Sequence, residues 1–100
     1  MDKYHIRRMI LEELVVMAPV PLTYDDVCGL PQLVSHHIKP DVVASELQGL
    51  TEKGYVADLR PGRGGLYRST AAGREQVNRE AELDEFVWGD LASRFMGGRG

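Results

Sequence analysis

The stretch Lys39–Arg74, KPDVVASELQGLTEKGYVADLRPGRGGLYRSTAAGR, decides the fold of this 100-residue chain. Pro40 suits the first position of a helix, because the N–H group that proline lacks would have no partner there, and Gly54 is a typical helix stop. Between them, apolar residues recur at helical spacing: Val43, Leu47 and Leu50. This pattern predicts a helix over about residues 40–53 with one buried face and one exposed face.

Two short strand-like runs follow this helix, at residues 55–60 and 66–70. The segment between them, Pro61–Gly65, has the sequence PGRGG, and its glycines adopt positive φ without strain. The pattern predicts a β-hairpin with a glycine-rich tip. The tip is basic, because Arg60 and Arg63 lie in or beside it.

The order of helix, glycine stop, hairpin with a basic tip and Thr70-capped helix resembles the winged helix-turn-helix proteins. The run LTEKGYV at Leu50–Val56 is similar to the end of a recognition helix in such regulators. The run YRSTAAGR at Tyr67–Arg74 is similar to the passage from the wing to the next helix in PadR-like and MarR-like repressors, except that Ser69 replaces their usual apolar residue. The second strand is therefore expected to pack less well than in those repressors.

This resemblance covers about residues 4–78 and implies a fold class. The expected fold is mainly α with a small β-hairpin (α+β), arranged as a winged helix-turn-helix with an added C-terminal helix. The resemblance also implies binding to double-stranded DNA and regulation of transcription. The helix at 40–53 would lie in a major groove, and the wing at about 55–69 would lie on the backbone or in the minor groove.

The N-terminal part of the chain predicts three further elements. An amphipathic helix is expected over about residues 2–17, because apolar residues recur there at intervals of three and four: Ile6, Met9, Ile10, Leu14 and Met17. A short strand is expected at Val20–Leu22. A short helix is expected next, with Thr23 as its cap and Asp26 at the capping-box position.

The connection at residues 29–39 is longer than the turn of a simple helix-turn-helix, and an extra helical turn is expected at residues 32–36. It contains the pair His36–His37, and imidazole both ligates metals and titrates near neutral pH. No Cys or Glu completes a ligand set at a familiar spacing, so no metal site is predicted. The histidines are expected at the surface, or as a phosphate contact beside the recognition helix.

The composition is that of a single folded domain, expected over residues 1–96, with a disordered tail at 97–100. No apolar run approaches the roughly 20 residues of a membrane-spanning helix, and the start lacks a signal-peptide pattern, so a cytoplasmic location is expected. The single Cys28 is expected to be a small buried residue. The pair Asp25–Asp26 fits helix-start chemistry. Without a nucleophile, a metal set or a phosphate loop, neither an enzyme nor a cofactor is predicted.

The net charge of −3 opposes nucleic-acid binding, but its distribution favours such binding. Residues 39–74 contain six basic and four acidic side chains, a local charge of +2. The rest of the chain contains six basic and eleven acidic side chains, a charge of −5. The positive charge thus lies in the segment where a winged helix would meet DNA.

The exposed face of the 40–53 helix is expected to carry Ser45 and Gln48, which can hydrogen-bond base edges. The side chains expected to hold phosphates are Lys39, Lys53, Arg60, Arg63 and Arg68. Asp41 and Glu46 are also expected near this face, where they would oppose phosphates unless they turn toward the N4 group of cytosine or away from the groove. Two interpretations therefore stay open beside DNA binding: an ordinary solvated helix face, and a winged-helix module that binds protein and not DNA.

The C-terminal helix, expected over residues 78–96, carries more large apolar side chains than a domain of this size requires. The side chains expected at a subunit interface are Phe86, Trp88, Leu91 and Phe95. Aromatic residues are frequent anchors of interfaces. A homodimer is predicted, because regulators of the resembling families commonly pair through terminal helices. The alternative is a lid on the domain's own core.

Overall fold

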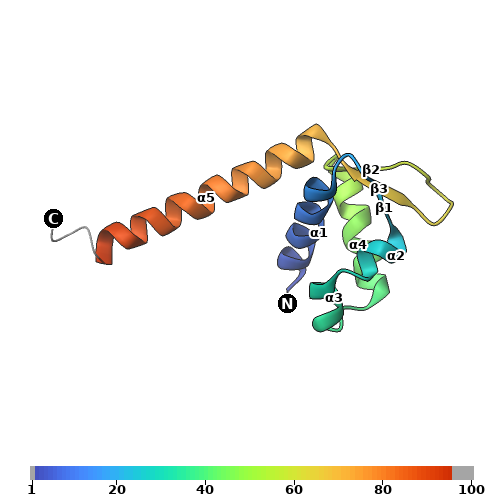
Figure 1. The fold of residues 1–100 in the computed structure, drawn as a ribbon, viewed down its shortest axis with the longest axis horizontal. Helices are drawn as coiled ribbons and strands as arrows, with labels where there is room; N and C mark the ends of the chain where they lie inside the picture. Colours follow the sequence, from blue (N-terminus) through green and yellow to red (C-terminus); the bar gives the residue numbers. More distant parts are fainter. Residues whose placement is uncertain (1, 96–100) are drawn as a thin grey trace.

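The computed structural model describes residues 2–95, with side chains as far as Leu83. Figure 1 shows a helical body with a small sheet at one side. The elements, in chain order, are α1 (Lys3–Met17), β1 (Leu22–Thr23), α2 (Tyr24–Cys28), α3 (Pro31–Ser35), α4 (Pro40–Glu52), β2 (Val56–Asp58), β3 (Leu66–Ser69) and α5 (Ala71–Phe95). The predicted α+β class is confirmed, because most of this chain is helical and a small antiparallel sheet accompanies the helices.

The sheet has three strands in the order β1-β3-β2. β2 and β3 are the two arms of the predicted hairpin, in which Val56 pairs with Ser69 and Asp58 pairs with Tyr67. β1 pairs with the other edge of β3. This first strand begins later than predicted, because Pro21 has no N–H group to donate to a neighbouring strand.

The core forms where α4 packs against α1. The predicted inward side chains of α4 are confirmed, since Val43, Leu47 and Leu50 are buried. They join apolar side chains from the other elements: Ile6, Ile10, Leu11, Leu14, Leu22, Val27, Leu33 and Val56. Met17, predicted on the inward face of α1, is instead 40% exposed, because the buried residues of α1 end at Leu14 and its last turn extends past the core.

The short helices α2 and α3 form as the local sequence signals predict. The Thr23 hydroxyl accepts a hydrogen bond from the Asp26 N–H at 3.1 Å, and the Asp26 carboxylate accepts one from the Thr23 N–H at 3.0 Å. α3 is the predicted extra turn of the connection, and its Leu33 is buried. The prediction of a buried Cys28 is wrong: this residue is half-buried, because it ends α2 at the edge of the core.

Glu46 lies on the inner side of α4, so its expected position near the DNA-facing side is wrong. It is buried and forms an ion pair with Arg7 of α1, with 2.8 Å between Arg7 Nε and Glu46 Oε2. Gly49 leaves room for the guanidinium group, because a Cβ there would lie 3.0 Å from a terminal nitrogen of Arg7. The pair neutralises an acid that the core could not otherwise bury, and it fixes α4 against α1.

α5 begins at a joint held by Thr70. The Thr70 hydroxyl accepts a hydrogen bond from the Gly73 N–H at 3.1 Å and donates one to the Gly54 carbonyl at 2.6 Å, so the predicted cap is confirmed. A Cβ at position 73 would overlap the Tyr55 carbonyl oxygen. Glycine is therefore needed for α5 to pass this close to the chain that enters β2.

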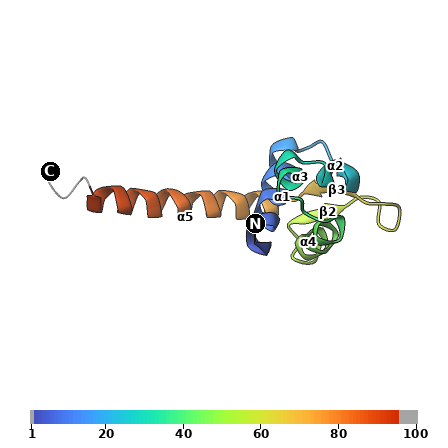
Figure 2. The ribbon, with the colours of Figure 1, turned by 90° about the horizontal axis from the view of Figure 1, so that it is seen from below.

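α5 packs on the body only along its first turns. Gln76, Val77 and Glu80 are half-buried, whereas the next three residues, at 81–83, are exposed. Figures 1 and 2 show the helix leaving the body on the side opposite the β2–β3 hairpin. The molecule is consequently elongated, with extents of 59 × 30 × 20 Å.

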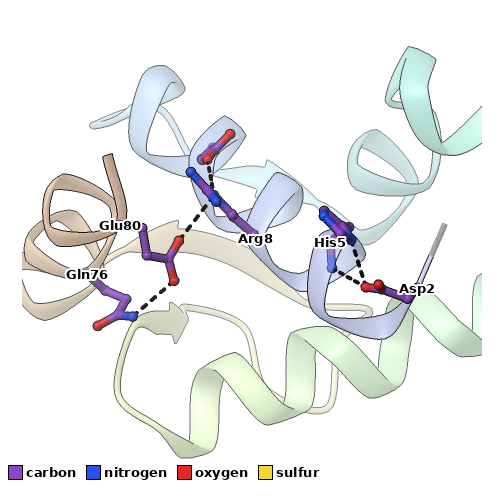
Figure 3. A network of polar contacts seen from close by, with 6 residues as sticks. Asp2, His5, Arg8, Gln76 and Glu80 are labelled. Atoms are coloured by element: carbon purple, nitrogen blue, oxygen red, sulfur yellow. Dashed lines mark hydrogen bonds and ion pairs between the residues drawn. The ribbon is translucent and has the colours of Figure 1, made fainter. Parts of the chain in front are cut away.

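A polar network holds the base of α5 to α1 (Figure 3). Arg8 Nε lies 2.9 Å from Glu12 Oε1 within α1 and 3.4 Å from Glu80 Oε2 of α5. Glu80 Oε1 in turn accepts a hydrogen bond from the Gln76 amide at 3.0 Å. These contacts, together with the close approach at Gly73, set the direction in which α5 leaves the body.

Substituting Gly73 with alanine is expected to destabilise the fold, although alanine favours helices. The added methyl group would push the start of α5 away from the Tyr55 carbonyl, at a cost of about 2 kcal/mol in the free energy of unfolding. Chemical denaturation measures this cost. Asn78→Ala, at an exposed position of the same helix, is the control and should be neutral or slightly stabilising. A Gly73→Ala variant as stable as that control would contradict the close approach.

Replacing Arg7 with methionine is expected to lower the free energy of unfolding by about 3–5 kcal/mol, because Glu46 is left buried without its cation. Adding Glu46→Leu to the same chain should recover most of this loss. Urea titrations of both variants measure the difference, with Arg79→Met, at an exposed position of α5, as the control. If Arg7→Met is as stable as that control, the ion pair between Arg7 and Glu46 does not stabilise the fold.

Candidate nucleic-acid interface

The outward face of α4 is a continuous exposed surface. The apolar side of the helix and Glu46 point into the body, so positions 41, 44, 45, 48 and 52 point away from it, and all five are exposed. Ser45 and Gln48, the predicted base readers, lie on this face, and Lys39 precedes its N-terminal end. The Gln48 amide donates a hydrogen bond to Glu52 at 3.2 Å, which orients the amide along the helix.

The tip of the β2–β3 hairpin is shaped by Asp58. One carboxylate oxygen of Asp58 accepts hydrogen bonds from the N–H groups of Arg60, at 3.0 Å, and Leu66, at 3.1 Å, which lie at the two ends of the tip. Gly65 is buried against the Tyr67 ring, which leaves no space for a Cβ, and its φ of 82° favours glycine. The hairpin tip therefore has a defined conformation.

The two arginines of the tip have different environments. The Arg60 guanidinium donates a hydrogen bond to the Gly65 carbonyl at 3.4 Å and so closes the loop. Arg63 is exposed, and its backbone N–H donates to the Arg60 carbonyl at 3.1 Å. Figure 1 shows the hairpin extending beyond the body. Arg63 is thus the better placed of the two to reach a ligand, a distinction that the sequence does not show.

A hollow of about 390 Å³, not among the sites expected from the sequence, separates α4 from the hairpin. Its walls are Ala44, Gln48, Thr51, Glu52, Asp58 and Tyr67. Burial, and then the Asp58 carboxylate, raise the pKa of Tyr67, so its hydroxyl stays neutral at physiological pH. The charged walls are thus Glu52 and Asp58, both acidic. The sequence feature that could have indicated this hollow is the alternation of residues along a strand, which places Asp58 opposite Tyr67 on one face of the sheet.

Two of the predicted phosphate contacts lie away from this surface. Tyr67 faces α4, and successive residues of a strand point to opposite faces, so Arg68 points to the other face of the sheet, where it is exposed. Lys53, just beyond α4, lines a separate hollow with residues of α1 and α5. The remaining five residues form what we name the candidate DNA surface: Lys39, Ser45, Gln48, Arg60 and Arg63.

Other predicted sites fall outside this surface. The predicted interface residues Phe86, Trp88, Leu91 and Phe95 lie in α5 beyond Leu83, where the structure describes the helix but not the side chains. The tail at 97–100 lies outside the described residues. His36 and His37 are exposed. Among the side chains that the structure describes, no three His, Cys, Asp or Glu groups gather as metal ligands would.

Within residues 2–95, no helix combines the length and the apolar character that crossing a membrane requires. The chain matches no family model, and no curated protein matches it.

Proposed function

We propose that this chain is a winged helix-turn-helix protein that binds double-stranded DNA and regulates transcription. The observation that carries the proposal is an exposed helix face next to a projecting basic hairpin (Figure 1). In the proposed complex, α4 lies in the major groove, and the hairpin lies on the adjacent backbone or in the minor groove.

The arrangement of the helices and the sheet supports a winged helix. The Tyr24 hydroxyl of α2 donates a hydrogen bond to the Pro40 carbonyl at the start of α4, which joins the two helices at a fixed point. β1 extends the hairpin to three strands. α4 has 13 residues, roughly 20 Å of helix, and the major groove is about 12 Å wide, so the outward face of α4 can enter it.

Each residue of the candidate DNA surface has a proposed role. Ser45 and Gln48 read base edges, and Gln48 can pair with adenine once it releases Glu52. Lys39 neutralises a phosphate at the start of α4. Arg63 contacts the backbone or enters the minor groove, and Arg60 mainly holds the loop that presents it.

We also propose that two copies of the chain pair through α5. Beyond Glu80 the helix leaves the body, and the Leu83 side chain is 58% exposed. Most helical stability in proteins comes from the packing of an apolar face, so a partner helix would stabilise this projecting segment. The large apolar residues of the segment are the candidate contacts: Phe86, Trp88, Leu91 and Phe95.

The acidic hollow favours a second candidate function, a winged-helix module that binds protein. Glu52 of α4 and Asp58 of β2 line this hollow, where they would repel a phosphate backbone. A basic segment of a partner protein would be attracted to the same place. Asp41, exposed on the outward face of α4, adds to this negative charge.

Titrating duplex DNA of random sequence at two salt concentrations tests the DNA proposal. The wild type is expected to bind, with an affinity that falls steeply as salt rises. Arg63→Ala should bind more weakly and reduce the salt slope by about 1, because one phosphate contact is lost. Arg79→Ala is the matched control, since this arginine is exposed on α5 outside the candidate DNA surface, and it should bind like the wild type.

In the same titration, Glu52→Gln separates the two candidate functions. Removing a negative charge beside the phosphates should raise the affinity for DNA. A partner protein with a basic segment would instead bind this variant more weakly than the wild type. A wild type that binds no DNA even at low salt would overturn the DNA proposal and favour the protein-binding module.

Sedimentation velocity tests pairing through α5. The wild type is expected at about twice the chain mass of 11.2 kDa. Trp88→Ala should shift the protein toward the monomer, because truncating a central aromatic anchor typically costs about 2 kcal/mol or more of binding energy. Val16→Ala, an apolar side chain of α1 that is 74% exposed, is the control and should stay dimeric. A monomeric wild type would rule out the pairing.

A further inference from the structure

α1, the end of α4 and the start of α5 enclose a hollow of about 110 Å³ that the proposed DNA contact does not use. Its basic walls are Arg7, Arg8 and Lys53, and its less polar walls include Tyr4, Leu11 and Leu50. Leu50 belongs to the inner side of α4, whereas Ser45 and Gln48 belong to the outer side. The hollow and the candidate DNA surface therefore lie on different sides of the same helix.

Three basic side chains line this hollow, and two of them already pair with acids. Arg7 pairs with the buried Glu46 at 2.8 Å, and Arg8 pairs with Glu12 at 2.9 Å, so neither arginine adds net positive charge. Glu80 already contacts Arg8 at 3.4 Å. Lys53 is exposed and has no acidic partner among the side chains that the structure describes. A lysine without an acidic partner beside a partly enclosed hollow attracts an anion.

Arg7 is held in position at this hollow before any ligand arrives. Its Nε donates to the buried Glu46 at 2.8 Å, and its guanidinium group lies against Gly49 of α4. A guanidinium group has five N–H donors, so the bond from Nε leaves others for a carboxylate. A donor that is already fixed loses little conformational entropy on binding.

The size and the apolar floor of the hollow limit which ligands can bind there. Leu11 and Leu50, which are 2% and 1% exposed, give it an apolar floor, and Tyr4 stands at its side. An engineered apolar cavity of about 150 Å³ in another protein holds benzene, and pockets for drug-sized ligands begin at about 300 Å³. At about 110 Å³, this hollow has room for a group of a few carbon atoms.

We infer that this hollow binds a small organic carboxylate. Arg7 and Lys53 hold the carboxylate group, and the short apolar chain of the ligand lies on Leu11, Leu50 and Tyr4. The bound molecule contacts α1, the end of α4 and the start of α5 together. This site does not depend on the proposed function, because its residues lie outside the candidate DNA surface.

Titration of the ¹⁵N-labelled full chain with butanoate, followed by amide NMR signals, tests the site. Signals of Leu11, Lys53, Tyr55 and Gln76 are expected to shift and to saturate. Butylamine, which has the same chain and the opposite charge, should produce no such shifts. Acetate should bind more weakly than butanoate, because it lacks the chain that covers the apolar floor.

Matched lysine variants test the charge of the site. Lys53→Met should weaken butanoate binding by about three- to fivefold, as expected for one exposed charge contact. Lys39→Met removes another exposed lysine, at the opposite end of α4, and should leave butanoate binding unchanged. Both lysines are exposed, so both variants are expected to keep the fold, which their amide spectra check directly.

Several results would overturn the inference. An absence of saturable shifts would show that the hollow holds only water. Equal binding of butylamine, or an equal effect of Lys39→Met, would show that the shifts do not come from a carboxylate held at Lys53. Equal binding of acetate and inorganic phosphate would show that the hollow binds simple anions. Shifts confined to residues elsewhere would show that butanoate binds at another surface.

Discussion

The burial of Glu46 is the constraint on which the exposed surface of α4 depends. An acid on the core-facing side of a helix needs a cation, and Arg7 of α1 supplies it, with 2.8 Å between Arg7 Nε and Glu46 Oε2. Gly49, which has no side chain, leaves space for the Arg7 guanidinium group. The ion pair joins one point of α4 to one point of α1, so it favours one orientation of the two helices over others. Because that side of α4 packs against α1, Ser45 and Gln48 on the opposite side remain exposed.

Two glycine-dependent joints give the molecule its elongated shape. At one, Gly73 lets α5 pass against the Tyr55 carbonyl before the helix runs out from the body. At the other, Gly65 lies under Tyr67 and lets the hairpin close around Asp58. The projecting helix and the hairpin therefore lie on opposite sides of the body, and the proposed contacts with a second copy and with DNA do not compete for the same surface (Figure 2).

The sequence predicts those elements whose signals are local. Apolar spacing locates α1 and α4, the Thr23 capping box locates α2, and glycines locate the hairpin. It fails where a partner comes from a distant part of the chain. A glutamate on a helix is usually solvated, and nothing near Glu46 in the sequence shows that Arg7 will meet it. The hollows likewise depend on how helices and strands pack, so the different surroundings of Lys53 and Arg63 follow only from the fold.

Mapping the DNA contact on the protein by amide NMR measures the central claim most directly. On adding duplex DNA to the labelled chain, the largest signal changes are expected along the outward face of α4 around Ser45 and Gln48, and at the hairpin tip around Arg63. Signals near Lys53 and at the start of α5 should change little. No signal changes at low salt, or changes confined to α1 and α5, would contradict a winged helix that binds DNA through α4.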